Sequence, residues 1–419
     1  MPSASEIIRF RNCSILRGHR IYKEDLWVRN KKIIDPEPVF YNERAMADIE
    51  VDCHGLLLAP GYIDVQINGR VIGDRFYVNT CWVAMGGALA GAVGVDFSED
   101  MANLREGVDK VAKHLLSTGT TSFCPTMVTS DPDKYKQIVP AIKPRNGGSH
   151  GAGILGLHLE GPFIAPEKKG AHQQHLIRNL DRGIQDLEET YGALDNVALV
   201  TLAPELDPEG TVTKSLVQRG IRVSMGHSVG TLSDGKQAVH NGATFITHLF
   251  NAMLPFHHRD PGLVGLLTTD FPKDCQLFFG MICDNIHTHP AALRIAQRSH
   301  PSGLVLVTDA MSAMGMPQGI HHLSQLQVEI RGQAAYLAST NTLAGSIATM
   351  DACVRNFYAA SGCTLVEALE AATLHPAQLM GITNTKGTLD YGTDADLVLL
   401  DSDLNVVRTY IEGECVWSK

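Results

Sequence analysis

Leu157-His158-Leu159-Glu160-Gly161-Pro162-Phe163 closes an apolar run that begins at Ile154. A run of apolar residues that stops at a carboxylate, a glycine and a proline predicts a buried strand followed directly by a loop. The tip of such a strand is where an α/β barrel places a catalytic or metal-binding group, so Glu160 is a candidate for either role. Alternatively, Glu160 caps the next helix or pairs with Lys168 or Lys169. The stretch alone does not decide between these two interpretations.

Similar apolar runs alternate with helical patterns and loops along the middle of the chain. The predicted strands span residues 61–67, 120–128, 153–160, 197–205, 221–227, 243–249, 277–284 and 303–309. Between the first two, residues 101–118 have the apolar spacing of a helix, which Gly119 ends. Eight strands, each followed by a crossover, predict a (β/α)8 barrel of the TIM type, although the helix after the sixth strand is weakly marked.

A doubly wound open sheet is the alternative α/β fold. It requires a glycine-rich turn after its first strand, and Gly151-Ala152-Gly153-Ile154-Leu155-Gly156 does match the pattern G-x-G-x-x-G. These glycines lead into a strand, however, instead of connecting a strand to a helix. The barrel is therefore the preferred interpretation.

Both ends of the chain contain short strand-like runs without a helical period. They lie at residues 7–10 and 25–28, and again at residues 395–400 and 406–411. Because chain termini often lie close together, these runs predict one small β-sandwich domain built from residues 1–59 and 385–419. Residues 60–384 then form the barrel.

Composition narrows the possible partners and location. A formal net charge of −10 argues against nonspecific binding to nucleic acid or to an anionic membrane, but leaves a small anionic substrate open. The nine cysteines include no Cys-x-x-Cys pair, which favours free thiols in a reducing compartment. The first ten residues lack a signal-peptide pattern, and residues 81–95 are too short and glycine-rich to span a membrane. We therefore expect a cytoplasmic protein without nucleic-acid or membrane partners.

Five polar residues follow the predicted strands at or just past their carboxyl ends. In a barrel these ends converge on one mouth. They are Glu160, His227, His248, His287 and Asp309. One glutamate and two histidines suit Zn²⁺ and related divalent ions, with a position left open for water. Any one of these histidines alone is more often structural, so the prediction depends on their shared position in the βα unit.

Two of the five residues suit roles in hydrolysis. Asp309 closes the run 304–309 and could act as general base beside a metal-bound water, then return the proton to a leaving amine. His287 could polarise the carbonyl under attack. The alternatives are that Asp309 caps the segment at Ser312 and that His287 is a loop histidine facing water.

Several loops suit an anionic ligand. Arg259 offers a planar fork for phosphate, although pairing with Asp260 explains it equally well. Asn251 lies just past His248. The loops at residues 170–172 and 343–346 have small side chains that allow a ligand to approach the backbone closely. None of these features is specific by itself.

Taken together, these motifs resemble the amidohydrolase superfamily and, within it, the N-acetylglucosamine-6-phosphate deacetylases of the animal type. The resemblance spans residues 59–413 approximately. The motifs that carry it are Pro60-Gly61-Tyr62-Ile63-Asp64, residues 156–163, Gly170-Ala171-His172, Gly226-His227-Ser228, residues 247–253, Thr308-Asp309-Ala310 and Gly392-Thr393-Asp394-Ala395-Asp396.

The resemblance implies a hydrolase of amino-sugar catabolism that converts N-acetyl-D-glucosamine 6-phosphate to D-glucosamine 6-phosphate and acetate. It implies Asp309 as the acid/base and His287 as the group that orients the acetyl carbonyl. Members of this family are typically homodimers, with the phosphate site near the subunit interface. The residues that it implies for sugar or phosphate binding, besides His287, are Ala171, His172, Asn251, Ala252, Arg259, Leu343, Ala344 and Gly345.

The first predicted strand differs from that of many amidohydrolases, which carry His-x-His at its end. Gln66 and Asn68 stand at these positions here, so half of a two-metal site is missing. We therefore expect one divalent metal ion per subunit, with Zn²⁺ as the expected species, held by Glu160, His227 and His248.

One segment departs from the family pattern. Val95-Asp96-Phe97 comes about twenty residues late because of an atypical insertion at residues 70–91, at the predicted barrel mouth. The insertion is either an added lid or an artefact of splicing or of the gene model, and its mixed composition favours the artefact. It keeps open a catalytically silent amidohydrolase-like scaffold as an alternative. An amidohydrolase acting on another amide, such as a cyclic one, is a further alternative.

Overall fold

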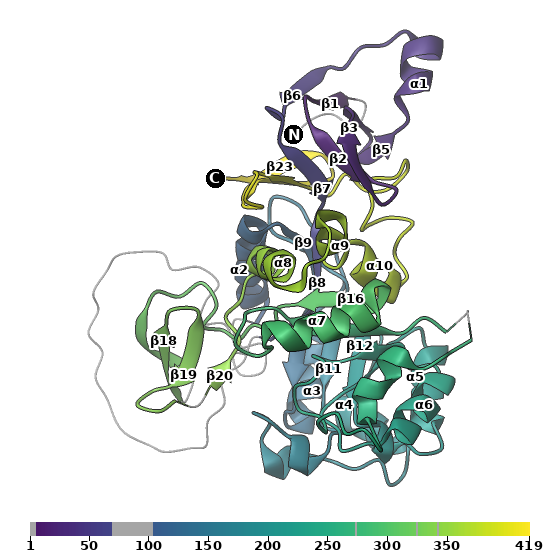
Figure 1. The fold of residues 1–419 in the computed structure, drawn as a ribbon, viewed down its shortest axis with the longest axis vertical. Helices are drawn as coiled ribbons and strands as arrows, with labels where there is room; N and C mark the ends of the chain where they lie inside the picture. The colour runs from purple at the N-terminus through teal and green to yellow at the C-terminus, as the bar shows by residue number, and fades with distance from the viewer. Residues whose placement is uncertain (1–5, 69–103, 273–274, 324–325, 342) are drawn as a thin grey trace.

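The computed structural model describes residues 6–68, 104–272, 275–323, 326–341 and 343–419. Its central body is a nearly closed barrel of eight parallel strands, of which the third is split into β10 and β11 (Figure 1). The strands are β8 (Tyr62–Asn68), β9 (Thr120–Val128), β10 (Gly153–Ile154), β11 (Leu157–Glu160), β12 (Val197–Leu202), β13 (Arg222–Met225), β14 (Phe245–Ile246), β15 (Phe278–Ile282) and β16 (Leu304–Val307). Each lies within a few residues of its predicted range, so the predicted barrel is confirmed.

Helices cover the outside of the barrel. They are α2 (Leu104–Leu115), α3 (Pro132–Ala141), α4 (Ile184–Tyr191), α5 (Thr211–Gln218), α6 (Leu232–His240), α7 (Pro290–Ser299) and α8 (Met350–Ser361). In α2 the predicted apolar face is buried, and Gly119 follows in the left-handed conformation with φ of 79°. After the sixth strand a 3₁₀ segment, η6 (Gly262–Thr268), replaces an α-helix, in keeping with the weak helical pattern there.

Short helical turns complete the crossovers and the connection to the C-terminal strands. They are α1 (Pro36–Pro38), α9 (Leu365–Glu370), α10 (Leu374–Met380), the π-helical turn η1 (Val39–Glu43) and the 3₁₀ turns η2 (Leu116–Thr118), η3 (Pro166–Lys168), η4 (Gln174–Leu176), η5 (Pro204–Leu206) and η7 (Pro301–Gly303). In Figure 1, α8, α9 and α10 lie between the barrel strands and the sheets at the chain termini.

The barrel has a seam between its first and last strands. Among the described strands, β16 and β8 form no ladder with each other. Instead, the main-chain N–H of Ile63 donates to the oxygen of Ala372 over 2.9 Å, and that of Leu306 donates to Ala371 over 2.8 Å. Nearer the mouth, the N–H of Asp309 donates directly to the oxygen of Gln66 over 2.8 Å. Ala371 and Ala372 thus bridge the two strands at the end of the seam that is farther from the mouth.

Strands from both termini form two further sheets that share one core. One sheet has the order β5-β4-β1-β6 and the other β23-β22-β21-β7-β2-β3. Phe10 from the first packs edge-on against Tyr410 from the second, with ring centroids 5.0 Å apart. The strands are β1 (Ile7–Arg11), β2 (Ser14–Arg17), β3 (Arg20–Lys23), β4 (Leu26–Arg29), β5 (Lys32–Ile34), β6 (Ile49–Asp52), β7 (Leu57–Pro60), β21 (Leu397–Leu400), β22 (Val406–Ile411) and β23 (Glu414–Ser418). The predicted sandwich of both termini is confirmed, while its exact limits stay a prediction.

A small antiparallel sheet follows the eighth strand and was not predicted. It has the order β17 (Gly319–Leu323), β18 (Leu326–Arg331), β19 (Ala334–Leu337) and β20 (Leu343–Gly345), and it stands beside the barrel in Figure 1. Its buried residues Val328 and Ile330 belong to one apolar cluster with Met311. The sheet is therefore anchored on the segment that directly follows Asp309.

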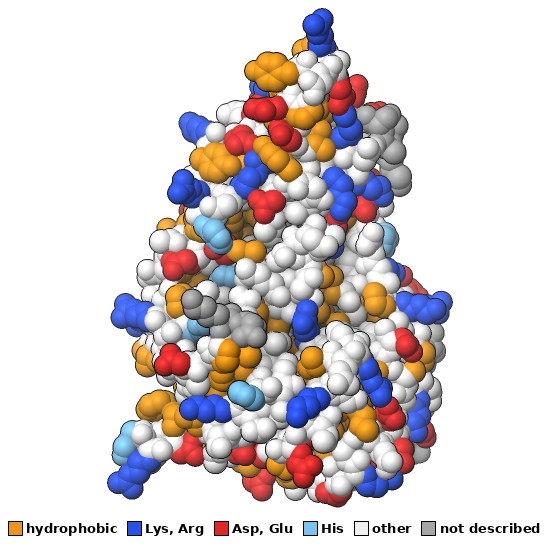
Figure 2. Space-filling model, turned by 90° about the vertical axis from the view of Figure 1, so that its right-hand side faces the viewer, with side chains coloured by type: hydrophobic (Ala, Val, Ile, Leu, Met, Phe, Trp, Pro, Cys, Tyr) orange, Lys and Arg blue, Asp and Glu red, His pale blue; other side chains and the backbone are white. Residues whose placement is uncertain are grey.

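The charge on the surface and the length of the helices are relevant to binding of nucleic acid and membranes. Figure 2 shows acidic and basic side chains interspersed over one face of the molecule. Within the described part of the chain, no helix is both long and apolar enough to cross a membrane. The predicted insertion at residues 70–91 lies outside the described residues.

Candidate active site

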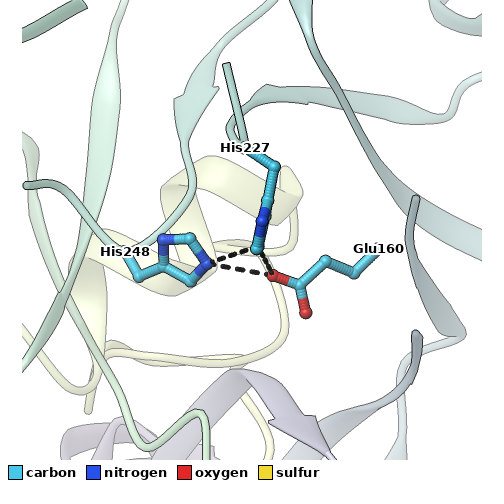
Figure 3. Close-up of side chains that lie close together, drawn as sticks. All are labelled: Glu160, His227 and His248. Carbon is cyan, nitrogen blue, oxygen red and sulfur yellow. Dashed lines mark hydrogen bonds and ion pairs between the residues drawn. The ribbon is translucent and has the colours of Figure 1, made fainter. Parts of the chain in front are cut away.

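Glu160, His227 and His248 meet at the mouth of the barrel (Figure 3). Glu160 ends β11, while the two histidines lie two residues beyond β13 and β14. Oε1 of Glu160 lies 3.1 Å from Nε2 of His227 and 3.0 Å from Nε2 of His248, and the two nitrogens are 3.0 Å apart. All three residues are buried. One carboxylate oxygen and two imidazole nitrogens facing one point form a donor set that fits a divalent ion of the zinc class.

The backbone at these strand tips is turned into an uncommon conformation. His227, His248 and Asp309 have φ angles of 49°, 28° and 46°, in a region that residues other than glycine seldom occupy. Such conformations cost roughly 1–3 kcal/mol each and persist only where the surrounding structure holds them. At all three positions the turn follows a buried parallel strand, and each residue lines the cavity at the barrel mouth.

Asp309 lies beside this cluster, and the side-chain amide of Gln66 connects the two by hydrogen bonds. Nε2 of Gln66 donates to Oε1 of Glu160 over 3.0 Å and to Oδ1 of Asp309 over 3.1 Å. Asn68 also donates to Oδ1 of Asp309 through Nδ2. Burial and the nearby charge of Glu160 raise the pKa of Asp309 well above its ordinary value. The two residues that replace His-x-His therefore hold the carboxyl group of Asp309.

Glu160 differs from Asp309 in its charge state. Burial opposes its ionisation, but hydrogen bonds with His227 and His248 outweigh burial and hold the pKa of Glu160 well below its ordinary value. Two carboxyl groups in one site thus have pKa values shifted in opposite directions. That arrangement is typical of sites where one carboxylate stays charged while the other exchanges a proton.

His287 is held by a carboxylate that the sequence did not single out. Oδ2 of Asp284 lies 2.6 Å from Nδ1 of His287, and Oδ1 accepts the main-chain N–H groups of Ile286 and His287 over 2.9 and 2.8 Å. Burial opposes the ionisation of Asp284, but the hydrogen bond and charge of His287, together with the two main-chain N–H groups, outweigh burial and lower the pKa of Asp284. Because an ionised carboxylate can only accept hydrogen bonds, Nδ1 of His287 is the donor. Nε2 is then the ring atom that is available to a ligand.

A cavity of about 260 Å³ opens above these groups and contains most of the predicted binding residues. Those that line it are Ala171, His172, Asn251, Ala252, Leu343, Ala344 and Gly345, together with Glu160, His227, His248, His287 and Asp309. Arg259 is not among the lining residues; its side chain is exposed, and its main-chain N–H donates to Nδ1 of His257 over 3.3 Å.

His172 is positioned against the metal-ligand cluster. Its Nδ1 accepts the main-chain N–H of Thr129 over 3.3 Å and lies 2.6 Å from the Thr129 hydroxyl. Its ring meets the ring of His227 edge-on, with centroids 4.5 Å apart. Since the main-chain N–H fixes Nδ1 as an acceptor, Nε2 of the neutral ring carries the proton.

Apolar residues that were not predicted also line the cavity. They are Val128, Ile282 and Met311. Val128 and Ile282 are the last residues of β9 and β15, so the strand-tip rule that selected Glu160 could have found them too. No signal in the sequence marks Met311, whose place depends on the small sheet that packs on it.

Comparisons with known proteins show the family to which this chain belongs. The model of the amidohydrolase family matches residues 57–416. The N-acetylglucosamine-6-phosphate deacetylase of Danio rerio is 55% identical over 419 residues, which cover 100% of this chain and 98% of the relative. The human protein of the same name is 55% identical over 417 residues, covering 99% and 97%.

Solved structures agree with these sequence relatives. The N-acetylglucosamine-6-phosphate deacetylase of Pasteurella multocida aligns with a TM-score of 0.80 at 28% identity, covering 99% of this chain and 100% of the other. A mutant of the Mycobacterium smegmatis enzyme in complex with N-acetyl-D-glucosamine-6-phosphate aligns with a TM-score of 0.78, also at 28% identity, covering 99% and 100%. The chain belongs to the amidohydrolase family. Within that family it belongs with the N-acetylglucosamine-6-phosphate deacetylases, as the sequence resemblance implied.

Proposed function

We propose that this protein hydrolyses the acetamide group of N-acetyl-D-glucosamine 6-phosphate to give D-glucosamine 6-phosphate and acetate. The observation that carries the proposal is the convergence of Glu160, His227, His248, Asp309 and His287 on one cavity. Relatives with this printed activity match the whole chain at 55% identity, which supports the choice of substrate. A catalytically silent scaffold is disfavoured, because the candidate metal ligands, the candidate acid/base and the candidate carbonyl-binding group are all present in the cavity.

Glu160, His227 and His248 would hold one divalent ion, with Zn²⁺ as the proposed species. When bound, such an ion supplies Lewis acidity and makes water nucleophilic near neutral pH. Nδ1 of His227 lies 2.8 Å from the main-chain oxygen of Lys168 and donates to it, which leaves Nε2 as the atom that would bind an ion. At the two positions where many amidohydrolases carry His-x-His, Gln66 and Asn68 each donate an amide N–H to a carboxylate, and an N–H donor does not ligate a cation.

Asp309 would move the proton in this reaction. Water adds to the acetyl carbonyl carbon and loses a proton to Asp309, and the same proton passes to the sugar nitrogen as the C–N bond breaks. The products are the amine and acetic acid, which loses its remaining proton to give acetate. The raised pKa of Asp309 suits a carboxyl group that must retain a proton between these two steps.

His287 would bind the acetyl oxygen. Its ring is oriented by Asp284 through Nδ1, so Nε2, when protonated, is the atom available to donate to the oxygen as charge develops there. His172 and Asn251, with the main chain at Ala171, Ala252 and residues 343–345, would bind the sugar and its phosphate.

Arg259 requires a separate explanation because it lies outside the cavity lining. We propose a homodimer in which this exposed arginine contributes to a phosphate site near the subunit interface. Support comes from its apolar neighbour Phe256, a residue that is 64% accessible in the single chain. Light scattering of the purified protein tests the dimer, and a monomer at working concentration would refute it.

We also propose a cytoplasmic location. The substrate is a phosphorylated sugar, and the described residues include eight cysteines as free thiols, which suits a reducing compartment.

The function is tested by acetate release from N-acetyl-D-glucosamine 6-phosphate and from the unphosphorylated sugar, and by ring opening of a cyclic amide. We expect acetate from the phosphorylated sugar at a much higher kcat/KM than from the unphosphorylated one, and no turnover of the cyclic amide. A second protein lacking residues 70–91 is assayed in parallel. Activity only in the shortened protein would show that the insertion blocks the site. If both proteins are folded and loaded with zinc and neither releases acetate, the proposed activity is wrong.

A further inference from the structure

Asp64 joins the first and last strands of the barrel at the seam. Its Oδ2 accepts the hydroxyl of Thr308 over 2.6 Å, and its Oδ1 accepts the main-chain N–H groups of Gln66 and Thr308 over 3.2 and 3.4 Å. Asp64 and Gln66 lie on β8, and Thr308 directly follows β16. These two strands form no ladder with each other. Together with the main-chain hydrogen bond from Asp309 to Gln66, the carboxylate therefore connects these two segments where strand pairing is missing.

Burial of the Asp64 carboxylate at this position costs free energy of folding. Asp64 is 0% exposed, and its sequence neighbours Ile63 and Val65 belong to a buried apolar cluster. Burial raises the pKa of Asp64 to about 7. Because an apolar residue usually stabilises such a position at least as well, a buried carboxylate there suggests a role beyond stability.

Both residues that donate to Asp64 are also connected to Asp309. Thr308 directly precedes it in the chain. Gln66 accepts the main-chain N–H of Asp309 over 2.8 Å and donates to its Oδ1 over 3.1 Å. Asp309 itself has a φ of 46°, so its conformation depends on these neighbours. Asp64 thus holds Gln66, one of the two residues that donate to the Asp309 carboxyl group, and Thr308, which precedes Asp309 in the chain.

We propose that Asp64 is a positioning residue for Asp309, fixing its carboxyl group at the seam through Thr308 and Gln66. This inference rests on the proposed function. Asp64 makes its own contact with Gln66 through the main-chain N–H, whereas the side-chain amide of Gln66 reaches the proposed metal ligand Glu160. A change at Asp64 should therefore displace the proton-transfer group while the metal and the substrate still bind.

The test compares Asp64→Asn with a matched control, Asp207→Asn. Asp207 is also a buried carboxylate that accepts one threonine hydroxyl and two main-chain N–H groups, from Val212 and Thr213, over 2.8–3.2 Å. It accepts N–H groups in the first turn of α5 and is not among the residues that line the cavity. For each protein, kcat and KM are measured with zinc-loaded enzyme, alongside metal content and Tm.

We expect Asp64→Asn to keep one equivalent of metal and a near-normal KM while kcat falls by about 10–100-fold, the scale of a misplaced catalytic group. Asp207→Asn should lower Tm and leave kcat within about twofold of the unchanged protein, since substitutions away from the site act on stability. Equal kcat values in the two variants, per folded metal-loaded molecule, would refute the positioning role. An inactive unchanged protein would instead refute the proposed function.

If Asp64→Asn does not fold, a pair of substitutions at Thr308 gives the same test. Thr308→Val removes the hydroxyl that donates to Asp64, and Thr308→Ser retains it. Loss of kcat at constant KM in the valine variant, with recovery in the serine variant, would support the inference. Normal kcat in the valine variant would overturn it.

Discussion

The main-chain oxygen of Lys168 accepts a hydrogen bond from Nδ1 of His227 over 2.8 Å. In return, the main-chain oxygen of His227 accepts the N–H of Ala165 over 2.8 Å. The loop after the third strand and the tip of the fifth are therefore bonded to each other in both directions. This reciprocal contact fixes the tautomer and the direction of a proposed metal ligand before any ion binds.

Removal of the metal should lower thermal stability. Glu160 and the two histidines bury ligand atoms within 4.8 Å of one another, so an ion that binds there stabilises the folded state. A bound ion at 100–1,000 times its Kd contributes roughly 3–4 kcal/mol, which for a chain of this length corresponds to a Tm lower by about 3–5 °C after chelation. Differential scanning calorimetry checks this shift. Glu160→Gln is the control, and the same chelation shift in that variant would contradict the assigned ligands.

Asp309→Asn should retain the fold and the metal but lose most turnover. The asparagine amide keeps the size of the side chain and cannot exchange the proton, so kcat should fall by about 10²–10⁴-fold. Metal content by elemental analysis and Tm serve as controls. Near-normal kcat in metal-replete Asp309→Asn would exclude Asp309 as the acid/base.

Asp284 and His287 should act as one unit. Substitution of His287 by asparagine removes the proposed donor to the acetyl oxygen, and loss of such a donor costs about 10²–10³-fold in kcat. Asp284→Asn removes the partner that lies 2.6 Å from Nδ1 and should reduce kcat by a smaller factor. In the double variant the two losses should not add, because both act through the same ring. Additive losses in a double-mutant cycle would show that the residues act independently.

Arg259→Ala should weaken substrate binding. A charge-assisted hydrogen bond to phosphate contributes about 1.5–3 kcal/mol, so KM should rise by roughly 10–100-fold. Turnover of the unphosphorylated sugar should be unaffected. Arg298 is an exposed arginine in the last turn of α7, and Arg298→Ala is the matched control. An unchanged KM in Arg259→Ala would rule out the phosphate contact.

The barrel and its ligand cluster were predictable because they follow from a local pattern. Each buried parallel strand is an apolar run, and its carboxyl end faces the mouth, so Glu160, His227 and His248 could be assigned to one site before their distances were known. Even β14 was found, although only Phe245 and Ile246 are paired, because the apolar run around it is longer.

Features that depend on distant contacts were not predictable. The seam at Ala371 and Ala372 requires two segments far apart in the chain to meet, and no periodicity marks it. The sheet at residues 319–345 consists of short strands whose burial is decided by Met311, a residue outside the sheet. Asp284 was assigned only as the end of a strand, because its contact with His287 appears only when the loop is folded.

Titration of metal-free protein with Zn²⁺, with acetate release from N-acetyl-D-glucosamine 6-phosphate followed at each addition, tests the central claim most directly. One ion held by Glu160, His227 and His248 predicts that activity rises in proportion to zinc and stops rising at about one equivalent per chain. Folded protein that binds zinc and releases no acetate would contradict the account. Activity that continues to rise until two equivalents are bound would contradict the single-metal site.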